Sequence, residues 1–238
     1  MISCPNCHVE MTDQAVETYS GVGRLGVGSC APCKLLWFDR SGSISLTPRA
    51  VLGLFQYIGT AAGAARTPLA STYRCPRCSD TLALTYDLQR STRFTYWRCA
   101  NDHGQLFTFN MFLREKNFIR SPTLAELNKL RETVRQISCS QCGGPIDLSE
   151  DTACTHCGAP IALIDPDGVA KAVHELTIGQ QASISPATQE QTRIALSNAQ
   201  LDAFLDQGPS DENESSHDLL AIGVAAIGAA LGAMLLAR

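Results

Sequence analysis

The sequence predicts small zinc-stabilised β-ribbon domains, three zinc ribbons in all, with connecting α-helices and a C-terminal transmembrane helix. Three observations predict this fold class. Ten of the 11 cysteines form five C-x-x-C pairs, aromatic residues make up only 6% of the 238 residues, and the last twenty residues are almost wholly apolar. Because short segments with few aromatic residues cannot bury enough apolar surface to fold alone, units held together by metal fit this composition better than one large core.

The cysteine count predicts three metal sites of four ligands each. Cys99 is the one cysteine outside the C-x-x-C pairs, and His103 follows it four residues later. Eleven thiols and one imidazole make three sets of four, the number of ligands that a structural zinc ion takes from protein. The predicted ligands of the three structural zinc ions are Cys4, Cys7, Cys30, Cys33, Cys75, Cys78, Cys99, His103, Cys139, Cys142, Cys154 and Cys157.

Other uses of these cysteines fit less well. An odd number argues against a closed disulfide framework, and thiolates that hold zinc imply a reducing compartment. An iron–sulfur cluster is the weaker alternative, because the ribbon-type pairs are independent and one set contains a histidine. A thioredoxin-like redox role needs a βαβ context, which the sequence does not show. A catalytic zinc keeps one position open for water, whereas each set here supplies all four ligands, so the predicted sites are structural.

The first ribbon is predicted over residues 1–49. Its two C-x-x-C turns flank residues 8–29, a stretch long enough for a hairpin. An apolar helix is predicted over residues 50–66. It carries no charge from Ala50 to Ala65 and is too short for a membrane span of about 20 residues, so we expect it to pack on the ribbons.

The second ribbon, predicted over residues 67–120, is an internal repeat of the first. Both ribbons open with Cys-Pro-x-Cys. In both, a leucine–aromatic pair follows the last ligand: Leu36-Trp37 in the first and Leu106-Phe107 in the second. We expect each pair to pack beside its metal.

A connecting helix over residues 121–138 leads to the third ribbon, predicted over residues 139–166. Thr123 and Glu126 have the spacing of a capping box. The third ribbon contains two near copies, CSQCGGPI and CTHCGAPI, and a glycine follows the second cysteine of each pair. Gly143 and Gly158 are expected to take positive φ, which lets backbone N–H groups approach the sulfurs.

The C-terminal part is predicted as a helical segment over 167–207, an acidic linker over 208–218 and a transmembrane tail anchor over 219–238. The 19 residues from Leu219 to Ala237 carry no charge and would span roughly 28 Å as a helix, close to the ~30 Å hydrocarbon core. The prediction is a single-pass membrane protein, anchored through residues 219–237, with its ribbons in the cytoplasm. The Gly228/Gly232 spacing also permits a homo-oligomer.

Charge is unevenly distributed along the chain. Residues 1–138 carry a net charge of +6 and residues 139–238 a net charge of −10. The second ribbon is both basic and aromatic, with Arg66, Arg74, Arg77, Arg90, Arg93 and Arg98 among Tyr73, Tyr86, Phe94, Tyr96 and Trp97. These residues could form a nucleic-acid surface; alternatively, the rings form the small core of the ribbon and the arginines a solvated face.

The first ribbon resembles a known family. In C-P-N-C over residues 4–7 and C-A-P-C-K-L-L-W-F-D over residues 30–39, Trp37 and Asp39 stand where small bacterial zinc ribbons of the transcription-factor-IIB type have them. The resemblance covers about 40 residues and implies a zinc-bound ribbon. The second ribbon is similar to a degenerate copy, with His103 in place of the last cysteine and Phe107 in place of the tryptophan. The third is similar to the rubredoxin-type double-knuckle ribbon.

No Ser/His/Asp set, paired-carboxylate motif or phosphate loop is apparent, so we do not expect an enzyme. The sequence favours a non-enzymatic, membrane-anchored adaptor that presents its ribbons to a protein partner. The alternative is a membrane-tethered, transcription-related module that binds nucleic acid through zinc ribbons.

Overall fold

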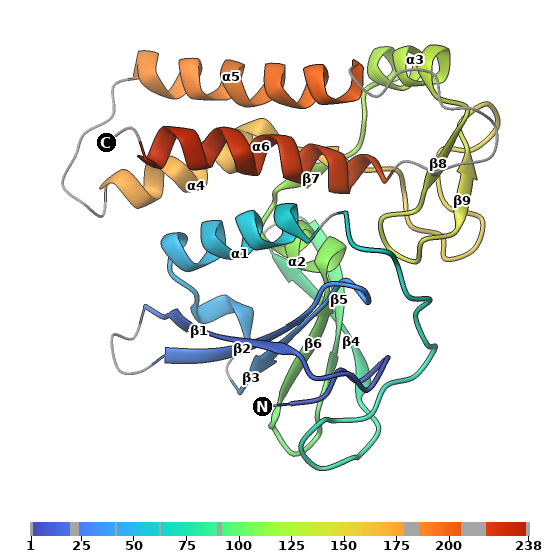
Figure 1. Cartoon of the computed structure of the whole chain (residues 1–238), viewed down its shortest axis with the longest axis vertical. Coiled ribbons are helices and arrows are strands. Elements are labelled where there is room, and N and C mark those ends of the chain that lie inside the picture. Colours follow the sequence, from blue (N-terminus) through green and yellow to red (C-terminus); the bar gives the residue numbers. More distant parts are fainter. Residues whose placement is uncertain are drawn as a thin grey trace. The chain divides into compact units, whose positions relative to one another are not determined.

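A computed structural model describes residues 2–19, 24–40, 42–61, 63–89, 92–178, 186–205 and 218–236. The chain divides into two compact units (Figure 1). Unit 1 comprises Met1–Leu54 and Ala64–Lys116, and unit 2 comprises Phe55–Gly63 and Asn117–Arg238.

Unit 1 contains one antiparallel sheet of six strands. The order across the sheet is β1 (Thr12–Glu17), β2 (Arg24–Cys30), β3 (Leu35–Asp39), β6 (Gly104–Thr108), β5 (Thr92–Arg98) and β4 (Ala83–Gln89). Strands β1 to β3 come from the first predicted ribbon and β4 to β6 from the second. The two ribbons are therefore joined through β3 and β6 rather than folded as separate domains (Figure 1).

The β3–β6 register relates the two ribbons by a pseudo-two-fold axis. Leu36 lies opposite Phe107, and Trp37 lies opposite Leu106. Leu106-Phe107 is the repeat of Leu36-Trp37, so the leucine of each ribbon lies opposite the aromatic residue of the other. The internal repeat has thus folded as an antiparallel dimer within one chain.

The two faces of this sheet have different cores. On one face, Trp37 and Leu106 are fully buried in a cluster with seven cysteines, Cys4 and Cys99 among them. On the other face lies an aromatic cluster in which Phe38 and Tyr96 contact Phe107, with ring centroids 5.5 and 5.0 Å apart. Such stacked and edge-to-face pairs stabilise a core beyond their buried area.

Helix α2 (Phe109–Glu115) covers part of the aromatic face, where Phe112 stacks on Phe38 at 5.7 Å. The Thr108 hydroxyl accepts a hydrogen bond from the amide of Met111 and caps the helix. Glu115 is buried at its end and accepts hydrogen bonds from the Ser43 hydroxyl (2.6 Å) and Lys116 Nζ (3.1 Å). These partners balance a carboxylate that would otherwise be costly to bury.

Unit 2 combines short β-pairs with helices. Its remaining elements are β7 (Ile119–Arg120), α3 (Leu124–Thr133), β8 (Gln136–Ser138), β9 (Pro145–Asp147), β10 (Leu163–Ile164), α4 (Pro166–Ile178), α5 (Pro186–Leu205) and α6 (Leu219–Leu236). Strand β7 pairs with β10, and β8 pairs with β9. The 3-10 turn Ser43–Ser45 and helix α1 (Pro48–Thr60) follow β3, and α1 passes from unit 1 into unit 2.

The predicted connecting helix is α3, and its capping box is confirmed. Thr123 Oγ1 accepts a hydrogen bond from the amide of Glu126, and the Glu126 carboxylate accepts one from the amide of Thr123 at 2.8 Å. Arg120 adds an ion pair to the same carboxylate at 2.6 Å. Together these contacts lower the pKa of Glu126 to about 2, the Arg120 hydrogen bond contributing most.

The predicted C-terminal transmembrane helix is wrong, and with it the single-pass anchor through residues 219–237. Among the residues that the structure describes, no helix is both long enough and apolar enough to cross a membrane. Helix α6 instead packs within unit 2 against α5 (Figure 1). It also contacts β10. Its apolar side chains Leu219, Leu220, Val224 and Ile227 are at most 4% exposed, so protein rather than lipid covers these four side chains.

Small residues allow this packing. A Cβ on Gly59 of α1 would lie 2.9 Å from the carbonyl oxygen of Val224, so α1 and α6 meet backbone to backbone there. Gly223 is similarly close to Ile164 of β10. Gly228, half of the predicted oligomer motif, lies beside Gln56 of α1. The predicted acidic linker falls outside the described residues except for Asp218.

Candidate metal centres

The structure brings together three groups of four side chains that could hold a metal ion. Site 1 is Cys4, Cys7, Cys30 and Cys33; site 2 is Cys75, Cys78, Cys99 and His103; site 3 is Cys139, Cys142, Cys154 and Cys157. Within each group all ligand atoms lie within 4.8 Å of one another. All twelve residues selected from the sequence are present, in the predicted sets of four.

The spacing of the ligand atoms fits a tetrahedral metal ion. Sulfurs bound to one zinc at about 2.3 Å lie about 3.8 Å apart along each tetrahedral edge. The sulfurs of Cys7 and Cys30 are 3.7 Å apart, and those of Cys142 and Cys154 are 3.6 Å apart. In site 2, His103 Nδ1 lies 3.5 Å from the sulfur of Cys99. A disulfide needs about 2.05 Å, so these are unbonded sulfurs around a common centre.

Four of the cysteine pairs form the same closed loop. In each, the amide of the first cysteine donates to the carbonyl five residues later, as Cys4 does to Val9 at 2.8 Å. The residue after the second cysteine donates back to the carbonyl of the first, as His8 does to Cys4 at 2.9 Å. The loops opening at Cys75, Cys139 and Cys154 repeat both bonds. These bonds direct the two sulfurs of each pair toward one point.

Positive φ closes these loops. Gly143 and Gly158 have φ of 82° and 71°, as the sequence predicts. His8 and Ser79 occupy the same loop position with φ of 61° and 65°, a conformation that costs a non-glycine residue energy. Backbone amides then reach the sulfurs, for example Gly144 N–H to Cys142 Sγ at 3.4 Å. Such bonds stabilise a thiolate.

Asn6, inside the first C-x-x-C turn, supports site 1 from outside the ligand set. Its Nδ2 donates to Cys33 Sγ at 3.2 Å and to the carbonyl of Pro68 at 3.0 Å. Its Oδ1 accepts from the amide of Ala70 at 2.8 Å. The side chain therefore joins a ligand sulfur to the chain that leads into the second ribbon.

Site 2 has its own supporting amide. Asn101 Nδ2 donates to Cys78 Sγ at 3.5 Å and to the Asp80 carboxylate at 2.6 Å. The amide of Arg77 donates to Cys75 Sγ at 3.5 Å, and the Arg77 guanidinium reaches across to Asp39 of the first ribbon. The second site is thereby tied to residues beside the first.

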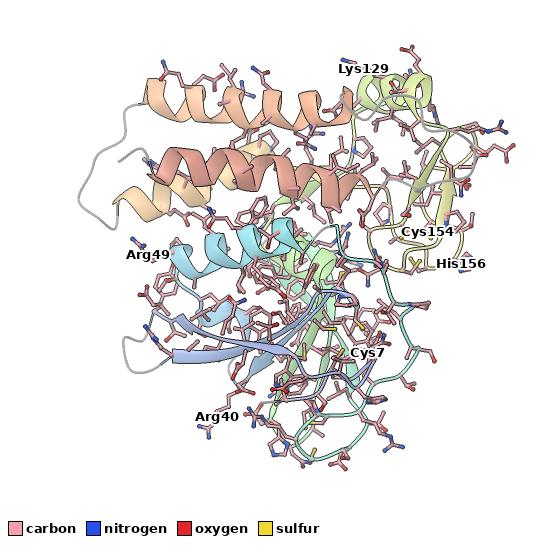
Figure 2. The ribbon with its side chains drawn as sticks, viewed as in Figure 1. Cys7, Arg40, Arg49, Lys129, Cys154 and His156 are labelled. Atoms are coloured by element: carbon pink, nitrogen blue, oxygen red, sulfur yellow. The ribbon has the colours of Figure 1, made fainter. Side chains whose placement is uncertain are left out.

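Site 3 lies in a separate apolar cluster of unit 2. Cys139 and Cys154 are buried with Ile146, Ile161 and Leu219 of α6. The Ser140 hydroxyl donates to Asp218 at 2.7 Å, and Asp218 in turn caps the first amides of α6. Cys157 is the one exposed cysteine. Figure 2 shows Cys154 and His156 in the loops next to β8 and β9, and Cys7 in the loops of site 1.

The thiols are poorly suited to share a site without a cation. Burial raises the pKa of Cys33 and of Cys75 to about 11 each, and burial also raises the pKa of Cys139. One thiol in each site has a lowered pKa instead. A hydrogen bond from Cys30 contributes most to taking the pKa of Cys4 to about 5, and although burial raises the pKa of Cys99 and of Cys154, hydrogen bonds outweigh it and lower both. A bound dication stabilises the thiolates together, and thiolate and imidazole are the ligands that zinc prefers in structural sites.

The residues of the predicted nucleic-acid surface do not form one surface. Tyr73, Phe94 and Tyr96 are at most 7% exposed. Trp97 is half-buried, packing edge-on against Tyr73 at 4.8 Å. Of the five rings, only Tyr86 is exposed, at 77%. Two arginines are engaged in ion pairs, Arg77 with Asp39 and Arg98 with Asp102, and Arg90 lies outside the described residues.

Sequence reasoning found the ligands but not the residues that support them. Asn6 and Arg77 occupy the same position inside Cys-Pro-x-Cys. This shared position is the one feature of the sequence that could have marked them as supporting residues. The position of Asp39 after Trp37 is visible in the sequence, but its partner Arg77 lies 38 residues away, so the pair cannot be inferred from spacing.

Comparison with known proteins does not assign the chain to a family. No family model matches the chain. No curated protein matches it in sequence, and no solved structure matches its fold. The resemblance of the first ribbon to the transcription-factor-IIB type therefore stays a prediction.

Proposed function

We propose that the protein is a non-enzymatic zinc-ribbon scaffold that binds a protein partner, with one structural zinc ion in each of its three sites. The observation that carries this proposal is the closure of the sites. Each site offers four protein ligands around one point, and a zinc with four protein ligands has no position left for water or substrate. In this arrangement the metal holds the fold and the protein surface does the binding.

The zinc identity is supported by ligand chemistry. The donors are eleven sulfurs and one imidazole nitrogen without any carboxylate, a combination that excludes hard cations such as calcium and magnesium. The amide hydrogen bonds to Cys33, Cys78 and Cys142 are the outer contacts that orient metal-bound thiolates.

Protein rather than nucleic acid is the favoured partner because of where the aromatic residues lie. Single-stranded nucleic acid needs exposed rings on which bases stack, next to free cations. Here most rings of the second ribbon form core contacts. The exposed large side chains are instead mainly aliphatic, among them Ile44 at 74% and Leu124 at 71%.

The proposal is tested with the full zinc-loaded chain in two binding assays. In the first, partners are identified by cross-linking in cells, and the interaction is rebuilt from purified components with and without chelator. We expect a defined protein complex that withstands high salt and disappears when zinc is removed. In the second, fluorescence anisotropy follows binding to single- and double-stranded oligonucleotides at low salt. Tight oligonucleotide binding that weakens steeply with salt, without a zinc-dependent protein complex, would overturn the proposal.

A further inference from the structure

Strand β4 carries an exposed apolar strip on the outer edge of the six-stranded sheet. Leu84, Tyr86 and Leu88 are 47%, 77% and 55% exposed. Because side chains alternate along a strand, all three point to the same face. Leu84 lies opposite Trp97, which lies opposite Leu106, so the strip continues the buried row on the metal-site face.

The pseudo-two-fold axis supplies an internal comparison. The strand at the other edge, β1, carries Asp13, Ala15 and Glu17 on the same face, since Asp13 lies opposite Gly28 and Gly28 opposite Trp37. The repeat aligns Ala15 with Tyr86, because both stand eleven residues after the first cysteine of their ribbon. One edge thus has carboxylates where the other has leucines. Carboxylates on an edge strand oppose sheet-to-sheet association, and exposed apolar side chains permit it.

The two edges also differ in their main chain. Thr47 donates its amide to the carbonyl of Glu17, and Tyr19 donates to Ser45, so residues 45–47 cover the end of β1. Within the described part of the chain, no main-chain hydrogen bond reaches the outer side of β4. The amide of Leu88 donates to the Asp87 side chain at 2.7 Å, a local bond that a neighbouring strand can replace.

We infer that β4 pairs antiparallel with β4 of a second copy of this chain, about a two-fold axis at Tyr86. The pattern of the strand is symmetric about that residue. Self-pairing sets Leu84 against Leu88 of the second copy, and Tyr86 against its own counterpart. On the opposite face, Thr85 meets Asp87 of the second copy, so no directly opposed pair carries like charges. Apolar and aromatic cross-strand pairs of this kind stabilise antiparallel ladders.

The same pairing at the other edge would be unfavourable. Two copies of β1 would gather both Asp13 and both Glu17 side chains on one face. The β4 pairing instead extends the six-stranded sheet into a continuous sheet of two copies with an isologous interface. The inferred β4 pairing does not depend on the proposed function, since it requires neither that the bound metal is zinc nor that a partner protein binds.

The test is sedimentation analysis of the full zinc-loaded chain and its variants. The wild type is expected to sediment as a dimer of the 25.6 kDa chain. Tyr86→Lys and Tyr86→Glu should each be monomeric, because the axis sets two like charges against each other. Mixing the two variants should restore a dimer containing one copy of each. Ala15→Lys, the matched change at the other edge, should remain dimeric.

Zinc content and far-ultraviolet circular dichroism of each variant show that it has folded. A wild type that is monomeric throughout the micromolar range would overturn the inference. So would a dimer that Tyr86→Lys leaves intact, or two charged variants that stay monomeric when mixed.

Discussion

Asp39 and Arg77 form a bidentate ion pair between the two ribbons of unit 1. Arg77 Nε and Nη2 lie 3.1 and 2.8 Å from Asp39 Oδ1, and Nη2 lies 2.7 Å from Oδ2. The same Oδ1 accepts a hydrogen bond from the Trp37 indole at 2.9 Å. Asp39 ends β3, whereas Arg77 lies between the site 2 ligands Cys75 and Cys78. The pair therefore joins the strand beside site 1 to a ligand loop of site 2.

Replacing Asp39 by asparagine should destabilise unit 1. The variant loses a planar, bidentate contact and leaves the arginine without its partner. The pair is partly exposed, so we expect a loss of about 1 kcal/mol in the free energy of unfolding. Denaturant unfolding of the zinc-loaded chain measures it. The control is Arg98→Gln, which removes an exposed pair to Asp102 within one ribbon and should have a smaller effect. If both changes lower the free energy of unfolding equally, the Asp39–Arg77 pair between the ribbons stabilises unit 1 no more than an exposed ion pair within one ribbon.

Sites 1 and 2 should lose metal together. Their seven cysteines belong to or pack against one buried cluster with Trp37 and Leu106, so disruption of one site should expose the other. Cys33→Ser is expected to leave one tightly bound metal ion per chain, the one in site 3. Cys142→Ser is expected to leave two. Metal retained against a competing chelator distinguishes them, and retention of two ions by both variants would show that sites 1 and 2 are independent.

Cys157 should be the first ligand to react with a thiol reagent. It is the only exposed cysteine, whereas Cys4 and Cys99 are 0% exposed, and reactivity of a thiol follows its accessibility. Brief alkylation of the zinc-loaded chain, followed by peptide mass spectrometry, gives the order of modification. Alkylation of Cys4 or Cys99 before Cys157 would contradict the burial of site 1 and site 2.

Two glycines of α1 should respond oppositely to alanine. At Gly59 the added methyl group meets the Val224 carbonyl of α6 at 2.9 Å, and overpacking of this kind costs roughly 1–3 kcal/mol. At Gly53 nothing lies within 4 Å, so alanine should stabilise the helix by up to about 1 kcal/mol. Thermal unfolding of the two variants compares them directly. If Gly59→Ala is as stable as Gly53→Ala, α6 does not pack on α1 as described.

The parts of the fold that sequence predicts are local. Cysteine spacing selects the sets of four because a C-x-x-C turn fixes two sulfurs by short-range hydrogen bonds. Thr123 and Glu126 predict the start of α3 for the same reason: the contacts span three residues. The hairpin predicted over residues 8–29 is the β1–β2 pair.

The parts that sequence does not predict depend on distant contacts. Leu36 and Phe107 are in register although 71 residues separate them, and neither strand alternates in a way that indicates its neighbour. The uniform apolar character of α6 suits lipid or a protein interior equally. Its cover comes from α1, α5 and β10. Phe94 and Tyr96 likewise have the composition of a nucleic-acid surface but face the core.

The most direct test of the account is the metal content of the purified full chain. Elemental mass spectrometry before and after treatment with a strong chelator gives the identity and number of bound ions, and circular dichroism follows the fold. The account predicts three zinc ions per chain and loss of structure when they are removed. Iron, no metal, or a fold unchanged after chelation would contradict it.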